Sequence, residues 1–457
     1  MIERIDPWVH GKRVLLLGFG REGQSTYQVL KQLGTCACLD IADQKPLAGH
    51  PAGLGDGGQE RWITGDDYQQ VMDQYDVVFK SPGIVLEKPI NDYRCQILSQ
   101  TEVFFQLFRD QIIGITGTKG KSTTTSLLYH EFKNAGMDCL VAGNIGIPAF
   151  DHIEEITPET RIVFELSCHQ LEYMTVSPHI GVLINIYEEH LDHYGTMEKY
   201  VAAKQRIFLN QRPQDILVCN VQCLPIPGSC PSRLISAAAI SGQGDVTVED
   251  RGAEGTFIRF QDSEYRIPSD KIKLLGQHNY FDIGVVYAVC RLEGMDGETF
   301  TRGLESYEPL PHRLQYLGQK DGVKYYDDSI STICATTIQA LKTLKDADTV
   351  LIGGMDRGID YSQLIGFLAE HPIPNIVLME ATGKRIYEEI LRDYPAFAGM
   401  ERLIAAGHLE DAVQKARAVT RPGRSCVLSP AAASYGIFRN FEERGEVFAR
   451  LVFEDLV

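Results

Sequence analysis

GITGTKGKSTTTSLL, residues 114–128, is the stretch that decides the fold in the middle of the chain. The apolar run 112–115 leads into it and is expected to form a buried strand, and residues 123–134 are suited to a helix. Between them, Gly117 and Gly120 let backbone N–H groups approach a phosphate, and the helix N-terminus adds partial positive charge. Strand, glycine turn and helix in this order predict a P-loop-type nucleotide site.

The side chains of this loop suit ATP and Mg²⁺. Lys121 can reach the terminal phosphates, and the hydroxyl of Ser122 or Thr123 can hold the metal ion. The full pattern G-x-x-x-x-G-K-[ST] requires glycine where this chain has Ile115, and a short GK[ST] motif alone could be an exposed basic turn. The flanking strand and helix favour the nucleotide site. Its predicted loop contacts are Gly117, Thr118, Lys119, Gly120, Ser122 and Thr123.

Length and composition indicate a globular protein of several domains. The 457 residues are too many for one core, and about three domains are expected. The formal net charge of −17 argues against nucleic acid or an anionic membrane as a partner. The N-terminus lacks signal-peptide features, no apolar stretch reaches membrane-spanning length, and the eleven cysteines form no paired CxxC motifs. We therefore expect a cytoplasmic protein with reduced thiols and no membrane insertion.

The N-terminal segment carries a second phosphate-binding pattern. A strand at 13–17 runs into Gly18, Gly20 and Gly23, which form G-x-G-x-x-G before a helix, and Asp40 follows at about the spacing of a dinucleotide fold. NAD is therefore a serious alternative ligand for this part. The same turn would, however, seat any diphosphate at a helix N-terminus.

A rigid turn follows the later strand predicted at 76–79. Lys80-Ser81-Pro82-Gly83-Ile84 would lie at the ligand-binding edge of a parallel sheet, although a plain connection explains it equally well.

The segment after the phosphate loop alternates strands and helices, as in a parallel α/β sheet. One strand ends at Glu165, and a second, at 180–184, is followed by His190. These are candidate Mg²⁺ ligands, although a solvated acidic loop is the alternative. Lys204 lies on a predicted helix, where an ordinary surface lysine is the simplest interpretation. Residues 224–273 are expected to be β-rich and peripheral.

The C-terminal third begins after prolines at 309 and 311 and is expected to form another α/β unit. Strands predicted at 323–326, 349–352 and 425–428 are each followed by polar residues. The carboxyl ends of parallel strands share one edge, which predicts a ligand site there. Further upstream, Asn279 is predicted to be the N-cap of a helix.

Taken together, these motifs resemble the Mur ligase family over essentially the whole chain. The specific parts are GITGTKGKST, GNIGIP, FELSCHQLE, NIYEEHLDHYGTMEKYVAAK, LPHRL and LSPAAASYGIFRNFEERGEVF, and the last, with SPGI, is typical of the glutamate-adding branch. The resemblance implies an α/β fold of three domains. These are a Rossmann-like UDP-sugar domain at 1–110, a P-loop-type ATP-binding domain at 111–310 and a Rossmann-like amino-acid domain at 311–457.

The resemblance also implies an activity and its ligands. It implies ATP- and Mg²⁺-dependent amide formation through an acyl phosphate, by a monomer that joins glutamate to UDP-N-acetylmuramoyl-L-alanine in peptidoglycan precursor synthesis. Lys121, His190 and Lys204 match catalytic positions, and Ser122, Glu165, His190 and Lys204 match the metal site. Lys204 matches a lysine that is carbamylated in the family, which would help to hold a second Mg²⁺.

The remaining family positions are carried over by motif. The further ATP contacts are Asn279, Arg313 and Asp328, and the substrate contacts are Gly18, Gly20, Gly23, Asp40, Ser81, Gly83, Asn144, Arg357, Ser434 and Phe441, of which the last three would hold the glutamate. Two departures lie on the glutamate side. Ile330 replaces a family lysine, and Arg357 stands where many members have lysine. D-glutamate is the expected substrate, with an L-glutamate-adding variant as the alternative.

Three other classes of protein remain open from the sequence. A nicotinamide dehydrogenase would use the Gly18 loop, but this interpretation leaves the second nucleotide loop unexplained. A folylpolyglutamate-type ligase resembles the central domain but normally lacks this N-terminal domain. A non-catalytic nucleotide-binding module is disfavoured by the intact candidate metal ligands.

Overall fold

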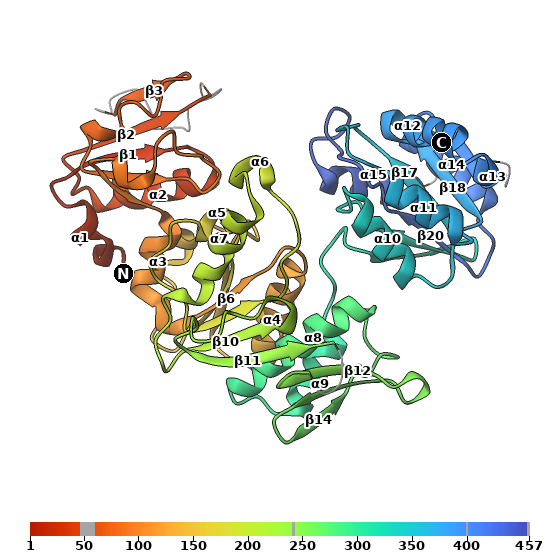
Figure 1. Ribbon diagram of the computed structural model, residues 1–457, viewed down its shortest axis with the longest axis horizontal. Coiled ribbons are helices and arrows are strands. Elements are labelled where there is room, and N and C mark those ends of the chain that lie inside the picture. Colours follow the sequence, from red (N-terminus) through yellow and green to blue (C-terminus); the bar gives the residue numbers. More distant parts are fainter. Residues whose placement is uncertain (46–59, 240–242, 399–400, 455–457) are drawn as a thin grey trace. The chain divides into compact units, whose positions relative to one another are not determined.

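The structure is a computed structural model that describes residues 1–45, 60–239, 243–398 and 401–454. The chain divides into two compact units (Figure 1). The first unit contains Met1–Leu274 and His278–Tyr307, and the second unit contains Leu275–Gln277 and Glu308–Val457. Each unit is α/β, as the sequence predicted, and the described residues form three sheets.

The N-terminal sheet has the strand order β3-β2-β1-β4-β5, and all of its strand pairs are parallel. Strand β1 is buried from Val14 to Leu17, because helices and loops cover both faces of such a sheet. The chain order reverses between β1 and β4, so the loops after these two strands meet at one edge. The elements are β1 Arg13–Leu17, β2 Cys38–Asp43, β3 Trp62–Thr64, β4 Val77–Lys80, β5 Gln96–Leu98, α1 Asp6–Val9, α2 Arg21–Leu33 and α3 Gln100–Phe108, with 3₁₀ turns at Ile2–Ile5, Met72–Gln74, Ile90–Asp92 and Arg109–Gln111.

The central sheet has the order β14-β13-β12-β11-β10-β9-β6-β8-β7. Its strands are parallel from β7 to β12, and β12, β13 and β14 pair antiparallel. The prediction of a β-rich segment at 224–273 is confirmed by β11 to β14. The strands are β6 Ile112–Thr116, β7 Cys139–Gly143, β8 Arg161–Glu165, β9 Ile180–Leu183, β10 Ile216–Asn220, β11 Arg233–Ala238, β12 Val246–Asp250, β13 Thr256–Phe260 and β14 Ser263–Arg266. The helices are α4 Lys121–Asn134, α5 Cys168–Leu171, α6 Leu191–Tyr194, α7 Met197–Leu209, α8 Gln277–Leu292 and α9 Gly297–Ser306, with 3₁₀ turns at Ala149–His152, Val221–Cys223 and Gly252–Glu254.

These first two sheets share one apolar core. A single cluster contains Leu16 of β1, Phe105 of α3 and Phe164 of β8. The rings of Phe105 and Phe164 meet edge to face with centroids 5.1 Å apart. The N-terminal and central sheets therefore belong to one packed unit.

The second unit contains the sheet β15-β16-β20-β17-β18-β19, in which only the β15–β16 pair is antiparallel. Strand β20 lies between β16 and β17, so the loops after all three strands are neighbours. The elements are β15 Gln315–Lys320, β16 Val323–Asp327, β17 Ala347–Gly353, β18 Asn375–Met379, β19 Leu403–Ala406, β20 Ser425–Leu428, α10 Cys334–Thr343, α11 Ser362–Glu370, α12 Glu380–Asp393, α13 Pro395–Ala398, α14 Leu409–Val419 and α15 Phe441–Phe453.

Some helix starts differ from the predictions. Helix α4 begins two residues before Thr123, because Gly120 with φ of +84° is its N-cap. Helix α8 begins at Gln277, directly after Gly276 with φ of +104°, so Asn279 lies inside the first turn and the N-cap prediction was wrong. Among the described residues, no helix has the length and apolar character to span a membrane.

Candidate active site

The loop between β6 and α4 contains two glycines that have close neighbours. Gly120 has φ of +84°, and a Cβ added there would lie 2.9 Å from Oδ2 of Asp282. A Cβ on Gly117 would lie 3.2 Å from Cβ of Ile184. Both glycines therefore allow the loop to lie close to its neighbours. Asp282, a buried acid of α8 beside this loop, carried no signal in the sequence because it is 162 positions from Gly120.

Asn185, which follows β9, anchors the loop. Its Oδ1 accepts hydrogen bonds of 2.9 Å from the backbone N–H groups of both Thr118 and Lys119, and its Nδ2 donates to the carbonyl of Lys119 at 3.0 Å. The hydroxyls of Thr118 and Tyr200 are 3.0 Å apart. Our sequence analysis did not assign Asn185 to the site, although a polar residue directly after a buried strand was a usable signal.

Two lysines approach the loop carbonyls. Nζ of Lys121 donates to the Thr118 carbonyl at 3.0 Å, and Nζ of Lys204 donates to the Gly117 carbonyl at 2.8 Å. Lys204 is 1% exposed, which corrects the surface-lysine interpretation. Burial, aided by the charge of Lys121, lowers the pKa of Lys204 to about 7, and burial also lowers the pKa of Lys121. The site therefore contains an amine that is about half neutral at pH 7.

Glu165 ends β8 beside these amines. Its Oε1 accepts from Nδ2 of Asn144 at 2.7 Å, so the two predicted residues are brought together. The other oxygen, Oε2, is buried and has no hydrogen-bond partner in the described part of the chain. A buried carboxylate oxygen of this kind costs free energy unless a cation or donor meets it. The geometry at Glu165 thus fits a divalent cation.

His190 lies at the N-cap of the short helix α6, with φ of +57°. Its ring centroid is 5.0 Å from that of His169 and 6.1 Å from that of Tyr200, whose hydroxyl contacts the phosphate loop. In the first turn of α4, Ser122 is half-buried and Thr123 is buried. Three of the predicted metal residues, Ser122, Glu165 and His190, therefore come from the ends of the neighbouring strands β6, β8 and β9 or from the segments that follow them, and Lys204 comes from α7.

At the edge of the N-terminal sheet, the Gly18 loop meets the turn after β4. Ser81 Oγ donates to the Gly18 carbonyl at 3.1 Å, and a Cβ on Gly18 would lie 2.7 Å from Ser81 Oγ. A Cβ on Gly23 would lie 2.2 Å from the Gly18 carbonyl oxygen, whereas Gly20 and Gly83 face open space. The two predicted turns thus meet in one glycine-lined edge at the N-terminus of α2, which suits a diphosphate.

Asp40 does not belong to this edge. It is 3% exposed in the middle of β2, and it accepts hydrogen bonds from Arg61 Nε at 3.1 Å and from the Tyr75 hydroxyl at 2.6 Å. Asp43 ends the strand and accepts from the backbone N–H of Phe19 at 2.8 Å. The Oδ1 of Asp40 accepts from the backbone N–H of Arg61 at 2.8 Å, so both of its oxygens are engaged within the fold, and its contact with a substrate stays a prediction.

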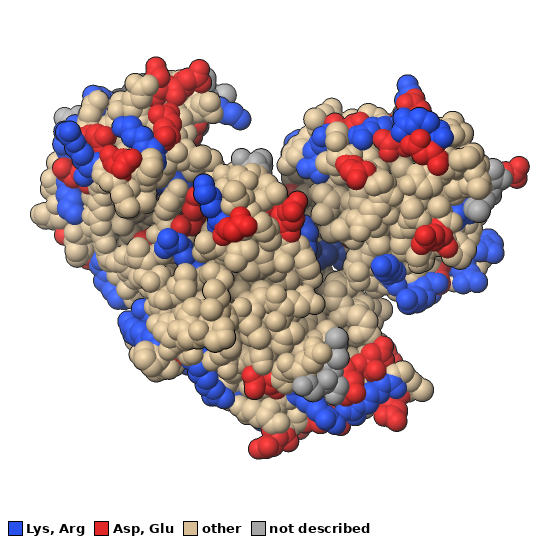
Figure 2. All heavy atoms as spheres, viewed as in Figure 1, with Lys and Arg blue, Asp and Glu red and all other residues tan. Residues whose placement is uncertain are grey.

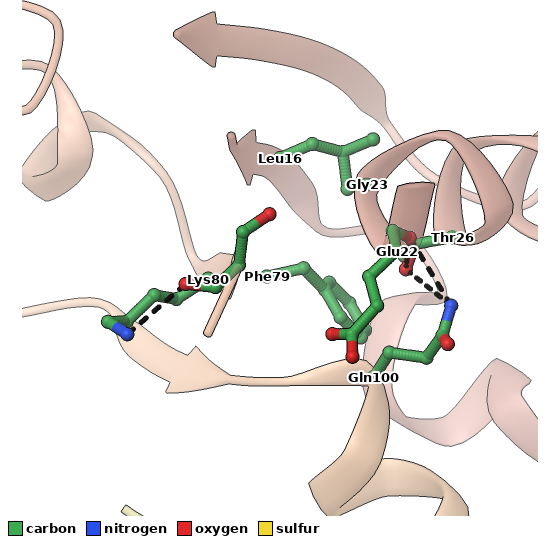
Figure 3. A pocket seen from close by; sticks show the side chains of 8 residues that line it. Leu16, Glu22, Gly23, Thr26, Phe79, Lys80 and Gln100 are labelled. Carbon is green, nitrogen blue, oxygen red and sulfur yellow. Dashed lines mark hydrogen bonds between the residues drawn. The ribbon is translucent and has the colours of Figure 1, made fainter. Parts of the chain in front are cut away.

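A small cavity lies behind the turn and is lined by β1, α2, β4 and the first residue of α3 (Figure 3). Nζ of Lys80 donates to the carbonyls of Ser81 and Pro82 at 3.2 and 3.1 Å. Burial lowers the pKa of Lys80 to about 8. Gln170 of α5 donates to Oε1 of Glu22 at 2.8 Å, which ties the central sheet to the N-terminus of α2. The sequence indicates Lys80 only as part of a turn, because no local pattern shows its burial.

The second unit brings most of its predicted residues to one edge. Asp328 accepts from the Leu314 N–H at 3.1 Å and from the Ser429 hydroxyl at 2.7 Å, and burial raises its pKa to about 7. Arg313 directly precedes Leu314, and its Nε is buried without a hydrogen-bond partner among the described residues. Ser434 is buried in the loop that follows β20.

Arg357 and Phe441 flank this loop. The N–H of Met355 donates to the Ala433 carbonyl at 2.9 Å, which joins the loop containing Arg357 to the loop containing Ser434. Arg357 is exposed, and its Nη2 donates to the Thr332 carbonyl at 2.8 Å. Phe441 begins α15, and its carbonyl accepts from Ser329 Oγ at 2.8 Å.

A buried arginine that our sequence analysis missed supports this edge. Arg444 of α15 is fully buried, and it donates from Nε to Ser329 Oγ at 3.0 Å and from Nη2 to the Ser329 carbonyl at 2.8 Å. It therefore fixes the turn after β16 against α15. Charge alone gave no signal, because arginines are mostly exposed.

Comparisons with known proteins show which family the chain is similar to. Residues 115–290 match the family model of the Mur ligase middle domain. The UDP-N-acetylmuramoylalanine--D-glutamate ligase of Geobacillus kaustophilus (strain HTA426) is 34% identical, with 96% of this chain and 97% of the relative covered. The ligase of the same name from Alkaliphilus metalliredigens (strain QYMF) is 32% identical over 96% of this chain and 98% of its own length.

Solved structures share the fold at lower identity. UDP-N-acetylmuramate-alanine ligase MurC from Thermotoga maritima aligns with a TM-score of 0.60 and 17% identity, covering 96% of this chain and 98% of that chain. MurF ligase from Thermotoga maritima, solved in complex with ADP, aligns with a TM-score of 0.58 and 16% identity, covering 98% of this chain and 96% of that chain.

Proposed function

Because the chain belongs to the Mur ligase family, we propose that it joins D-glutamate to UDP-N-acetylmuramoyl-L-alanine in an ATP-dependent step of peptidoglycan precursor synthesis. The observation that carries this proposal is the 34% identity, along 96% of the chain, to a relative named as that ligase. The neighbouring phosphate loop, buried carboxylate and buried amines supply the groups that such a reaction needs.

The reaction requires activation of a carboxylate. At neutral pH a carboxylate does not accept an amine, so phosphoryl transfer from ATP must first convert it to an acyl phosphate. Lys121, held at the start of α4, is in position to release the Thr118 carbonyl and neutralise charge on the transferring phosphoryl group. The amine of glutamate then attacks the acyl carbon, and phosphate leaves.

Lys121→Ala should slow turnover by about 10²-fold or more, because one contact to the transferring group is lost. Binding of the UDP-sugar should persist, since the proposed sugar-nucleotide site uses the Gly18 loop. Lys133→Ala, an exposed lysine at the other end of α4, is the matched control. Phosphate release measured with both substrates and ATP tests the assignment, and a nearly normal rate in Lys121→Ala would sink it.

Mg²⁺ fits the residues that surround the loop. Glu165 offers a buried carboxylate oxygen without a partner among the described residues, and Ser122 and His190 are the further proposed ligands. When bound there, Mg²⁺ would offset negative charge on the phosphates of ATP. Glu165→Gln should therefore raise the Mg²⁺ concentration that gives half-maximal activity, and an unchanged Mg²⁺ dependence would remove Glu165 from the ligand set.

We also propose that Lys204 is carbamylated. Its pKa of about 7 leaves roughly half of the amine neutral at pH 7, and a neutral amine adds to CO₂ to give a carbamate anion and a proton. The product would be a carboxylate-like ligand beside the phosphate loop, suited to a second Mg²⁺.

¹³C NMR with ¹³C-labelled bicarbonate tests this modification. A carbamate resonance should be present in the unmodified sequence and in Lys199→Ala, an exposed lysine of the same helix, and absent in Lys204→Ala. Short-chain carboxylic acids should partly restore activity to Lys204→Ala. Full activity of Lys204→Ala without added acid would contradict the proposal.

On the substrate side, the glycine-lined edge around Gly18, Gly20, Ser81 and Gly83 is the proposed site of the UDP diphosphate. The further proposed ATP contacts are Asn279, Arg313 and Asp328. Arg357, Ser434 and Phe441 are the proposed contacts of glutamate. Arginine offers a planar fork to a carboxylate, which suits the exposed position of Arg357.

Kinetic measurements identify which enantiomer of glutamate the protein uses. Once both carboxylates are held, the two enantiomers direct the α-amine differently, and misplacement by about 1 Å can cost on the order of 10²-fold in rate. D-glutamate should have the higher kcat/KM at saturating ATP and UDP-N-acetylmuramoyl-L-alanine. A preference for L-glutamate would assign the chain to the L-glutamate-adding variant, and equal rates would contradict the proposed carboxylate contacts.

We further propose a cytoplasmic monomer whose partners are small molecules. On the face shown in Figure 2, basic and acidic side chains are interspersed, which does not favour a polyanion as partner. Light scattering after size exclusion tests the monomer, and fractionation of the source cells tests the location.

A further inference from the structure

We propose that His169, Glu172 and His193 form a Zn²⁺ site that is separate from the proposed Mg²⁺ site and goes beyond the ligase function. His169 lies in α5, Glu172 is the residue that caps its C-terminus, and His193 lies in α6 (Figure 1). A ring nitrogen from each histidine and a carboxylate oxygen of Glu172 all lie within 4.8 Å of one another. None of these three side chains has a role in the proposed ligase chemistry.

The spacing of the ligand atoms is close to that of a zinc site. Nε2 of His193 is 3.0 Å from Oε2 of Glu172, and these side chains are only 10% and 19% exposed. In a tetrahedral site with metal–ligand bonds of about 2.0–2.1 Å, neighbouring ligand atoms are about 3.3 Å apart. The His169 and His193 rings, with centroids 4.3 Å apart, are close enough for side-chain rotation to complete the set.

The ligand types select the metal. Two imidazoles and one carboxylate match the donor set of protein zinc sites that leave one position open, whereas Mg²⁺ prefers oxygen ligands. The Tyr194 hydroxyl is 3.4 Å from Nδ1 of His169, and the two rings are stacked with an interplanar angle of 4°. A contact of this kind can hold a ligating ring in orientation.

A bound ion would join α5 to α6. Both helices are only one turn long, and each follows a strand of the central sheet, so few bonds fix them to each other. His190 is the N-cap of α6, and its ring is 5.0 Å from that of His169. Zn²⁺ would therefore also restrain the loop that presents His190.

Co²⁺ binding to the full-length, metal-free protein provides a test that does not depend on turnover. One equivalent of Co²⁺ should give the intense visible absorption of four-coordinate cobalt, and Zn²⁺ should abolish it, but excess Mg²⁺ should not. His193→Ala and Glu172→Gln should weaken Co²⁺ affinity by at least 10-fold. Glu172→Gln keeps the shape of the side chain, and circular dichroism verifies that each variant is folded.

His152→Ala is the matched control. Nδ1 of His152 lies 3.0 Å from Oε1 of Glu155, which is the same separation as in the proposed site. This variant should bind Co²⁺ with unchanged affinity.

Two results would overturn the proposal. One is the lack of an intense cobalt band in the unmodified protein. The other is a band that survives His193→Ala and disappears in His190→Ala, which would put the ion at the proposed Mg²⁺ site. Loss of the band in both variants leads to the same conclusion, because His190, a proposed Mg²⁺ ligand, would then bind the same ion and the two sites would not be separate. Because no assay step uses ATP or glutamate, failure here is distinguishable from failure of the ligase assignment.

Discussion

Glu131, in the helix that begins at the phosphate loop, should make the stability of the first unit fall as pH rises. The residue is fully buried, and neither carboxylate oxygen has a hydrogen-bond partner in the parts of the chain that the structure describes. It faces Gly303 of α9, where an added Cβ would lie against Oε2 of Glu131. Burial raises the pKa of Glu131 from 4.5 to about 9.

The direction follows from proton binding in the two states. Between pH 4.5 and 9 the folded protein keeps the proton on Glu131, while the unfolded chain has lost it. The unfolded state therefore gains relative stability as pH rises, by about 1.4 kcal/mol per pH unit. From pH 6 to pH 8 this amounts to about 2.7 kcal/mol, a large share of the roughly 5–15 kcal/mol typical of folded domains.

Glu131→Gln removes the ionisation and keeps the shape. Urea unfolding is followed by circular dichroism at pH 6 and pH 8. The free energy of unfolding of the variant, relative to that of the unmodified protein, should be about 2.7 kcal/mol higher at pH 8 than at pH 6. Hydrogen exchange of peptides from α4 should locate the change. Glu154→Gln, at an exposed glutamate, is the control. A difference between the two proteins that does not vary with pH would refute the reasoning.

Three further substitutions test the loops and the second unit. Asn185→Ala removes the acceptor of two loop amides and should weaken ATP binding, measured by calorimetry, by roughly 10-fold. Unchanged affinity for ATP would mean that the loop keeps its shape without Asn185. Gly23→Ala puts a Cβ 2.2 Å from the Gly18 carbonyl oxygen and should weaken UDP-sugar binding more than ATP binding. Equal losses of affinity for the two ligands in parallel titrations would contradict a local effect. Arg444→Lys removes the planar guanidinium that donates two hydrogen bonds to Ser329, and it should destabilise the second unit by roughly 2 kcal/mol. Thermal unfolding would detect this loss, and a melting temperature equal to that of the unmodified protein would contradict the prediction.

The strands could be predicted because their signals are local. Arg13–Leu17 and Ser425–Leu428 match the predicted bounds, and the observed Ile112–Thr116 extends the predicted run by one residue. Each is a short apolar run next to a glycine or proline turn, and burial on both faces of a parallel sheet requires that composition. The α/β architecture of three sheets followed from these runs and from the family resemblance.

The site was harder to predict from the sequence, because its contacts join distant parts of the chain. The hydrogen bonds of Asn185 to the phosphate loop span 66 and 67 positions, and no local pattern encodes them. Spacing alone also does not tell whether an acid such as Asp40 lies within a strand or at its end. Lys204, in contrast, could have been recognised as buried. It shares its helix face with Tyr200, Ala203 and Ile207, the spacing of an apolar stripe.

The core shared by the first two sheets limits how the chain can be divided. A fragment ending at residue 110, the boundary predicted from the sequence, would expose Phe104, Phe105 and the other apolar residues that pack against β8. Burying a phenylalanine is worth about 1.5–3 kcal/mol, so losing several such contacts would remove much of the stability of a small domain. The N-terminal Rossmann-like part is therefore expected to depend on the central part for its folding. Ligand sites that look separate along the sequence would then gain or lose their shape together when the protein unfolds.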